Sequence, residues 1–321
     1  MYNVVISFGN FPTRFRDGRP GPYTEEELGI MWLKHVAQFS EPGMLAKYRL
    51  VLLLPREVLI PEDVDLSKWG EKKRIDDNNS TQPWPIGPNM AFQQILWCYV
   101  HGKLEGPFLW CEPDCVPVKP DWLDQLFAEY ERVGKPFMGN LVESFISRDG
   151  FRTPKHMTGN AIYSDKAYAI APRLLECRGT AWDVFAAREI LLDKHFHQTS
   201  LIQHELNDQA NPSLDPNAVL YHPEKFGRLI KRLNGDVPSL MAATGLGKPL
   251  FEIFSEPEPS SIDTMLDQVR LACRDDREIH RKVAYYMIDN GIVSDGFWRG
   301  AKIKGTLAKK KTEAAHAGSP E

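Results

Sequence analysis

The chain has 321 residues and a formal net charge of −4, which excludes a protein coated with positive charge but not a local basic patch. Its hydrophobic fraction of 42% and charged fraction of 26% allow a globular core of normal size. No apolar run approaches the roughly 20 residues that span a bilayer. The N-terminus enters an apolar run directly, without a basic segment or cleavage site. We therefore expect a cytoplasmic protein with no membrane partner.

Apolar runs alternate with helical patterns in the first half of the chain. Short apolar runs predict buried strands over residues 4–8, 49–54 and 107–110. Helical patterns begin near Thr24, Asn89 and Pro120. At the first of these, Thr24 and Glu27 have the spacing of a capping box. The polar, proline-rich stretch over 56–88 predicts a long functional loop.

This alternation predicts an α/β fold with a mostly parallel sheet and right-handed crossovers. Ligands of such sheets bind at the carboxyl ends of the strands. The loops after Phe8, Leu54 and Trp110 should therefore share one edge of the sheet.

The chain changes character after about residue 235. Residues 234–261 have a loop-like composition, helical patterns run over 262–290, and lysines gather in the tail after Arg299. We expect a catalytic domain over 1–235, followed over 236–321 by a linker, a helical C-terminal region and a basic tail. No internal repeat is apparent.

The five cysteines are an odd, scattered set, which favours reduced thiols over a disulfide framework. Cys111 and Cys115 are close in sequence, but no second pair completes a zinc site. We interpret them as buried small hydrophobic residues.

An acidic triplet, Glu112-Pro113-Asp114, directly follows the third predicted strand. A divalent ion held by carboxylates at a strand end can bridge a diphosphate and act as a Lewis acid on the leaving group. Oxygen ligands select Mg²⁺ or Mn²⁺. Two acids in a loop are usually only solvated, but here a buried strand delivers them to the ligand-binding edge. Asp114 is the predicted metal ligand. Glu112 is predicted to bind the metal directly or through water, or to hold a ribose hydroxyl.

The segment from Phe108 to Pro117, followed by Pro-Asp-Trp-Leu from Pro120, resembles the DxD region of GT-A glycosyltransferases. It departs from the Asp-x-Asp pattern because its first acid is a glutamate, Glu112. At the level of layout the resemblance covers residues 1 to about 230. It implies a GT-A fold, a Rossmann-like and mostly parallel sheet flanked by helices, here with a C-terminal helical extension. It also implies sugar transfer from a UDP- or GDP-type nucleotide-diphosphate sugar to an acceptor hydroxyl, with Mn²⁺ or Mg²⁺.

The resemblance assigns donor-binding roles to further residues. The corner before the second predicted helix, 84–89, is similar to a Gly-Pro-Asn that lines the donor site and gives this role to Asn89, although simple helix initiation explains it equally well. The segment 156–163 resembles the stretch under the transferred sugar, with Gly159 and Asn160 as its site residues, although a turn or β-bulge is the alternative. Phe8, at the end of the first strand, completes the predicted donor side.

A histidine near the end of the catalytic region often completes the metal site of such enzymes, with a lysine close by near the diphosphate. His222 and Lys225 match this pattern, although Phe226 replaces the usual acid beside the lysine. The alternative for His222 is a purely structural role. Three other histidines compete with His222 for this role: His195, His197 and His204. We interpret His195 and His197, which are separated by one residue, as a strand pair. The basic residues at 14, 16 and 72–74 either contact phosphates or form solvated faces.

Asp183 follows the sugar-binding segment, where an inverting enzyme needs a carboxylate base. Thr180 and Asp183 also have the spacing of a capping box that would open a helix through Leu192. A carboxylate tied to its own helix start is a poorer base, so the two interpretations compete.

Several acceptors and functions stay open at this stage. The lysine tail is compatible with phosphate contact, and small transferases of this type resemble phage enzymes that glycosylate a 5-hydroxymethylpyrimidine in DNA, which would place the protein in the host cytoplasm. Synthesis of a surface glycan is the alternative. A sugar nucleotidyltransferase is disfavoured, since residues 9–14 lack the glycine-rich loop and lysine expected after the first strand. The acidic balance disfavours a non-catalytic nucleic-acid-binding module.

Overall fold

The computed structural model describes residues 1–9, 11–14, 20–77, 85–146, 152–177, 179–205, 214–223, 225 and 227–234. Backbone contacts divide the chain into two compact units, and the described residues belong to the first, which covers 1–208 and 213–234. The predicted linker, C-terminal helices and basic tail lie outside the described residues. None of the described helices is long and apolar enough to cross a membrane.

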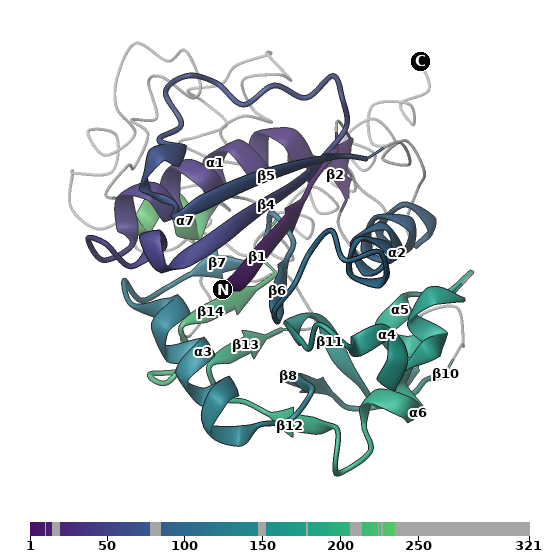
Figure 1. Cartoon of the computed structure of the whole chain (residues 1–321). Coiled ribbons are helices and arrows are strands. Elements are labelled where there is room, and N and C mark those ends of the chain that lie inside the picture. The colour runs from purple at the N-terminus through teal and green to yellow at the C-terminus, as the bar shows by residue number, and fades with distance from the viewer. Residues whose placement is uncertain are drawn as a thin grey trace, which may run out of the picture. The chain divides into compact units, whose positions relative to one another are not determined.

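The core of the first unit is a seven-stranded sheet in the order β12-β8-β11-β6-β1-β4-β5 (Figure 1). Strand β1 pairs in parallel with β4 and β6, while β11 runs antiparallel to both of its neighbours. The predicted α/β class with a mostly parallel sheet is confirmed, and the three predicted strands do end at one edge. The strands are β1 Tyr2–Ser7, β4 Tyr48–Leu54, β5 Glu71–Asp76, β6 Phe108–Cys111, β8 Phe137–Val142, β11 His156–Tyr163 and β12 Phe196–Gln198.

The first helix begins at the predicted capping box. The backbone N–H of Glu27 donates to Thr24 Oγ1 at 3.1 Å, and the backbone N–H of Thr24 donates to Glu27 Oε2 at 2.7 Å. The α-helices are α1 Glu25–Phe39, α2 Ile86–Val100, α3 Trp122–Val133, α4 Ala167–Ile170, α5 Trp182–Phe185, α6 Ala187–Ile190 and α7 Arg228–Leu233. Short 3-10 helices cover η1 Leu45–Lys47, η2 Leu66–Lys68 and η3 Pro172–Leu175.

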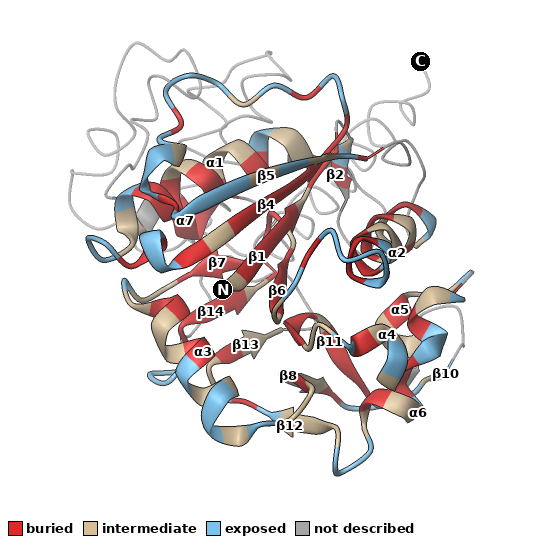
Figure 2. Ribbon diagram, in the orientation of Figure 1, coloured by how far each residue is buried: buried red, intermediate tan, exposed pale blue. Residues whose placement is uncertain are grey.

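Side chains alternate between the two faces of the sheet, so the inner strands β1, β4, β6, β8 and β11 contribute to two separate cores. In Figure 2 the inner strands β1, β4 and β6 are mostly buried, whereas the edge strand β5 is mostly exposed. On β1, Val4 and Ile6 pack with residues of α1 and α3, while Val5 packs with α2 and the short helices after β11. Burial on both faces explains why these strands are continuous apolar runs.

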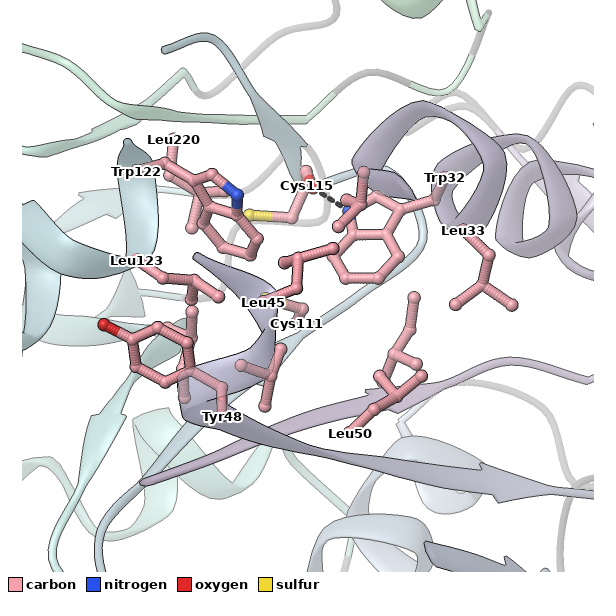
Figure 3. Close-up of a cluster of buried hydrophobic side chains, with 14 of the residues drawn as sticks. Trp32, Leu33, Leu45, Tyr48, Leu50, Cys111, Cys115, Trp122, Leu123 and Leu220 are labelled. Carbon is pink, nitrogen blue, oxygen red and sulfur yellow. Dashed lines mark hydrogen bonds between the residues drawn. The ribbon is translucent and has the colours of Figure 1, made fainter. Parts of the chain in front are cut away.

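Two tryptophans fix the loop that follows β6. The indole N–H of Trp32 in α1 donates to the carbonyl of Cys115 at 2.6 Å, and the Trp122 ring meets Trp32 edge-on at 6.2 Å (Figure 3). Both rings are fully buried, and a buried side chain of this size contributes at least about 2 kcal/mol of stability. Cys111 and Cys115 are buried in the same core, as predicted. Helix packing thus holds the backbone on either side of the acidic triplet.

The prediction of one long loop over 56–88 is wrong for 71–76, which form the edge strand β5. Its side chains are mostly exposed and charged, so it has no apolar run to identify it. Charge on an edge strand discourages pairing with another chain. Arg74 has a structural role, since its guanidinium donates to the carbonyls of Pro55 and Val58 at 2.7 and 2.9 Å.

A small sheet joins distant parts of the sequence beside the end of β6. Strand β14 (Leu220–His222) lies between β13 (Ile202–His204) and β7 (Val116–Pro117). Because Tyr221 pairs with Val116, His222 arrives next to the acidic triplet. Two further pairs are β2 (Pro12–Arg14) with β3 (Pro20–Thr24), and β9 (Phe145–Ile146) with β10 (Arg152–Thr153).

Candidate metal and donor site

Two carboxylates and one imidazole converge at the carboxyl end of β6. The His222 Nε2 atom lies 3.3 Å from Glu112 Oε2 and 3.5 Å from Asp114 Oδ1. Ligand atoms of all three residues lie within 4.8 Å of one another. Glu112 and Asp114 come from the loop after β6, and His222 comes from β14. The structure therefore brings together the three residues that the sequence predicted as metal ligands.

The cluster already contains compensating positive charge. Lys225 Nζ lies 2.7 Å from Asp114 Oδ2, and only 3% of the Asp114 side chain is exposed. Burial alone would raise the pKa of Asp114, but Lys225 and His222 together hold it well below its usual value. Burial likewise opposes protonation of His222, but Asp114 and Glu112 raise its pKa to about 9. The two carboxylates thus bind cationic groups strongly.

This set of donors fits a divalent ion. Carboxylate oxygens are the ligands that Mg²⁺ and Mn²⁺ prefer, and an imidazole nitrogen is a common additional ligand. A bound divalent ion would supply to the two carboxylates the positive charge that Lys225 and protonated His222 supply in its absence. Glu112, Asp114 and His222 are the residues that would hold it.

Asn160 holds Glu112 in place from the neighbouring strand β11. Its Oδ1 accepts the backbone N–H of Glu112 at 2.8 Å, and its Nδ2 donates to Glu112 Oε2 at 3.3 Å. Asn160 is fully buried. Its amide therefore fixes both the backbone and the side chain of Glu112.

Gly159 lies against the segment that carries Asp183. A Cβ on Gly159 would lie 2.8 Å from Trp182 Cζ2 and 3.6 Å from Asp183 Oδ2. The Trp182 ring stacks on Phe92 at 4.6 Å and its indole N–H donates to Tyr163 Oη at 3.2 Å. A side chain larger than hydrogen at 159 would displace this ring.

Asp183 is not part of a capping box. The residue before α5 is Ala181, no side chain caps this helix, and the predicted helix through Leu192 is divided into α5 and α6. Asp183 Oδ1 accepts the backbone N–H of Val184 at 2.8 Å. Burial raises the pKa of Asp183 to about 6, His156 opposes this, and the charge of Glu112 adds to it. The backbone of Ala186, with φ −92° and ψ 6°, ends α5 and separates it from α6, so the single helix that the capping interpretation requires does not form.

Asn89 is tied to the same segment. Its Nδ2 donates to the carbonyl of Thr180 at 2.6 Å, and its Oδ1 accepts the backbone N–H of Trp182 at 3.0 Å. Asn89 is 2% exposed. The Asn89 side chain thus holds the backbone just before Asp183, and its predicted donor contact stays a prediction.

Phe8 is also buried, with its ring packed directly on Gly29, and its donor role stays a prediction too.

Glu25 is a site residue that the sequence did not reveal. It is the first residue of α1, and its carboxylate accepts the backbone N–H of Gly9. Burial raises its pKa to about 7, Lys225 and Gly9 oppose the rise, and the charges of Glu112 and Asp114 add to it. It therefore lies within electrostatic reach of the metal cluster. In the sequence, Glu25 directly follows Thr24, and an acid at a helix start is common without any role in a site.

The other histidines separate into two groups. His204 joins the site, since its Nδ1 lies 2.8 Å from His222 Nδ1. His197 and His195 lie around β12, where they contact Glu129 Oε1 at 2.8 Å and the carbonyl of Glu189 at 2.9 Å. Their interpretation as part of a strand is confirmed for His197.

No family model matches the chain, and no curated protein matches it. Among solved structures, HddC from Yersinia pseudotuberculosis is 14% identical, with 62% of this chain and 90% of that chain covered and a TM-score of 0.37. Mouse xyloside xylosyltransferase 1 is 10% identical, with 69% and 96% covered and a TM-score of 0.43. The galactosyltransferase LgtC, in complex with donor and acceptor sugar analogues, is 10% identical, with 75% and 99% covered and a TM-score of 0.41. At these values the likeness does not assign a function, so the function has to be argued from the site.

Proposed function

We propose that the chain is a metal-dependent glycosyltransferase that moves a sugar from a nucleotide-diphosphate donor to an acceptor hydroxyl. The observation that carries this proposal is the convergence of Glu112, Asp114 and His222 at the carboxyl end of β6. The DxD-like sequence of the triplet and the edge of the sheet where it lies both favour a diphosphate ligand.

Each residue of the site has a proposed role. Glu112, Asp114 and His222 hold Mn²⁺ or Mg²⁺, which when bound acts as a Lewis acid on the diphosphate leaving group. Lys225 places an ammonium beside Asp114 and stabilises negative charge as the nucleoside diphosphate departs. Asn160 keeps Glu112 in position while the backbone at Gly159 lies close to the donor sugar, and Phe8 and Asn89 complete the donor side.

Asp183 is the proposed base of an inverting reaction. The acceptor oxygen forms its bond to the anomeric carbon, the bond to the diphosphate breaks, and the acceptor proton passes to the carboxylate. Because Oδ1 is engaged by the Val184 N–H, Oδ2 is the oxygen that takes the proton. A pKa of about 6 leaves Asp183 ionised at neutral pH and still basic enough to accept it.

The acceptor is proposed at the level of class. A 5-hydroxymethylpyrimidine in DNA is supported by the lysine tail and by the resemblance to phage enzymes, and a surface glycan is the alternative. Incubation of hydroxymethylated DNA and of glycans with a panel of UDP- and GDP-sugars, followed by mass spectrometry, separates them. Absence of hexose or pentose mass on the DNA would rule out the DNA acceptor.

The donor chemistry is tested by Asp114→Ala. We expect Mn²⁺-dependent hydrolysis of a UDP- or GDP-sugar to fall about 1,000-fold, since a metal contributes several kcal/mol to leaving-group departure. Asp63→Ala is the matched control, because the exposed carboxylate of Asp63 pairs with Lys34 at the surface. Unchanged hydrolysis in Asp114→Ala would overturn the metal assignment. A nucleotidyltransferase would instead leave the nucleotide sugar intact and release pyrophosphate from a nucleoside triphosphate and a sugar 1-phosphate supplied together.

A further inference from the structure

His204 and His222 form a directly paired set of imidazoles. The parallel register of β13 and β14 places them opposite each other, and their rings stack at 4.9 Å and 25°. The two Nδ1 atoms are 2.8 Å apart. A neutral imidazole has one N–H and one lone pair, so this contact requires a proton on one Nδ1 and a lone pair on the other.

The other nitrogen of His222 decides which ring donates. His222 Nε2 faces Glu112 Oε2 at 3.3 Å and Asp114 Oδ1 at 3.5 Å. A metal ion accepts only the lone pair of a ring nitrogen, so a ligating Nε2 carries no proton. The proton of His222 is then on Nδ1, and this N–H needs an acceptor because only 13% of the side chain is exposed.

We propose that His204 is the positioning residue for the metal ligand His222, with its Nδ1 lone pair accepting the Nδ1–H of His222. This inference rests on the proposed metal site. His204 fixes the tautomer in which the Nε2 lone pair of His222 faces the two carboxylates, and the stacked ring prevents rotation of the imidazole. Partners that orient a ligating histidine in this way commonly change metal affinity 10- to 100-fold.

Two substitutions separate the hydrogen bond from the packing. His204→Phe keeps a stacked ring but removes the acceptor, and His204→Asn places an amide oxygen close to the position of Nδ1. His197→Phe is the matched control, because His197 of β12 contacts Glu129 of α3 and is not part of the metal cluster.

The experiment titrates the full chain with Mn²⁺ alone and follows free Mn²⁺ by electron paramagnetic resonance. We expect His204→Phe to raise the Mn²⁺ Kd about 10- to 100-fold, while His204→Asn stays within about threefold of the native chain and His197→Phe is unchanged. In donor hydrolysis, saturating Mn²⁺ should restore the rate of His204→Phe, because only metal affinity is affected. Native Mn²⁺ affinity in His204→Phe, or an equal loss in the Phe and Asn variants, overturns the positioning role.

The same titration on Asp114→Ala distinguishes this proposal from the proposed function. If Asp114→Ala loses Mn²⁺ binding while His204→Phe retains native Mn²⁺ binding, only the role of His204 fails. If Asp114→Ala retains Mn²⁺ binding, the metal site itself fails, and the role of His204 fails with it.

A second measurement needs no variant. In the Mg²⁺-loaded chain with ¹⁵N-labelled histidine, NMR should show His204 protonated at Nε2 and His222 at Nδ1. A proton on His204 Nδ1 overturns the proposal.

Discussion

Asp114 and Asp183 lie in the same site but in regions of opposite electrostatic character. Asp114 lies in the loop after β6, between Lys225 and His222, and these cations lower its pKa well below the usual value despite its burial. Asp183 is the second residue of α5, next to Trp182, and burial raises its pKa to about 6. Asp114 is therefore ionised at neutral pH, while Asp183 takes up a proton as the pH falls through about 6.

In the proposed reaction, this difference lets one residue type serve two steps. A carboxylate surrounded by cations is a good metal ligand and a poor base, whereas a desolvated carboxylate is a better base. The difference between the two carboxylates depends on which side chains the backbone brings close to each of them. The β7–β14 pairing delivers His222 to Asp114, while Asn89 and Gly159 hold the segment of Asp183 against aromatic rings.

The comparison predicts opposite effects on stability for two equivalent substitutions, and the larger belongs to Asp114→Asn. Removing its charge takes one buried carboxylate away from Lys225 and His222, and breaking a buried ion pair in this way costs about 3 kcal/mol. The native pKa of Asp114 is lowered, so its stabilisation is present above about pH 4 and is lost in acid. Urea unfolding near pH 7 should show the loss, accompanied by the roughly 1,000-fold fall in donor hydrolysis. Equal unfolding free energies of variant and native chain would contradict the ion-pair account.

Asp183→Asn should slow sugar transfer about 100- to 10,000-fold, as loss of a general base does, yet stabilise the fold. The native pKa of Asp183 is raised to about 6, so ionisation destabilises the folded chain as the pH rises from about 4 to 6 and above. The side-chain amide oxygen of the variant can still accept the hydrogen bond from the backbone N–H of Val184. We expect a gain of about 2 kcal/mol in unfolding free energy near pH 7.5 and none near pH 4.

The control for Asp183→Asn is the pH profile of the native chain. Transfer should rise with pH through about 6, because the ionised form of Asp183 is the base, and the variant should lose this limb. A variant that is destabilised at both pH values, or that retains the limb, would exclude Asp183 as the base.

The sequence predicts the framework of this site better than its details. Continuous apolar runs identify β1, β4 and β6, and their shared direction places the triplet at the ligand edge. By contrast, β5 is an exposed edge strand whose charged side chains hide it. Glu112 and His222 are 110 residues apart in the sequence, and the pairing of β7 with β14 brings them together. These strands have two and three residues, and strands so short leave no periodic pattern in the sequence.

Local pattern also did not reveal the tertiary contacts of three side chains. Glu25 fits a helix start, and only its approach to Lys225 reveals the link to the site. His204 resembled a competitor of His222 until the strand register paired the two. Asn89 matched a donor motif, but the burial of its amide against residues 91 and 93 positions further along the chain could not be predicted from spacing.

Gly159→Ala tests how tightly the Asp183 region is packed. Its Cβ would lie 2.8 Å from Trp182 Cζ2, so the ring and the adjoining carboxylate must shift. We expect transfer to fall about 100-fold, since displacement of reacting groups by about 1 Å has that effect, while Mn²⁺ affinity stays native. Combining it with Trp182→Phe, which removes Cζ2, should recover part of the rate. No recovery in the double variant would mean that Gly159 acts through the donor and not through Trp182.

The smallest predicted effect separates two roles of Asn89. Asn89→Ala leaves the Thr180 carbonyl and the Trp182 N–H without their partner, which costs about 1 to 3 kcal/mol and loosens the segment before Asp183. A positioning role lowers kcat about tenfold and leaves the KM of the donor unchanged, whereas a direct donor contact raises that KM. Gln93→Ala is the matched control, since Gln93 lies one turn along α2 and donates to the carbonyl of Cys177 outside the site. Steady-state kinetics of the two variants decide the question: a raised donor KM in Asn89→Ala alone would return Asn89 to the donor site, and an unchanged KM would place it with Gly159 in the support of Asp183.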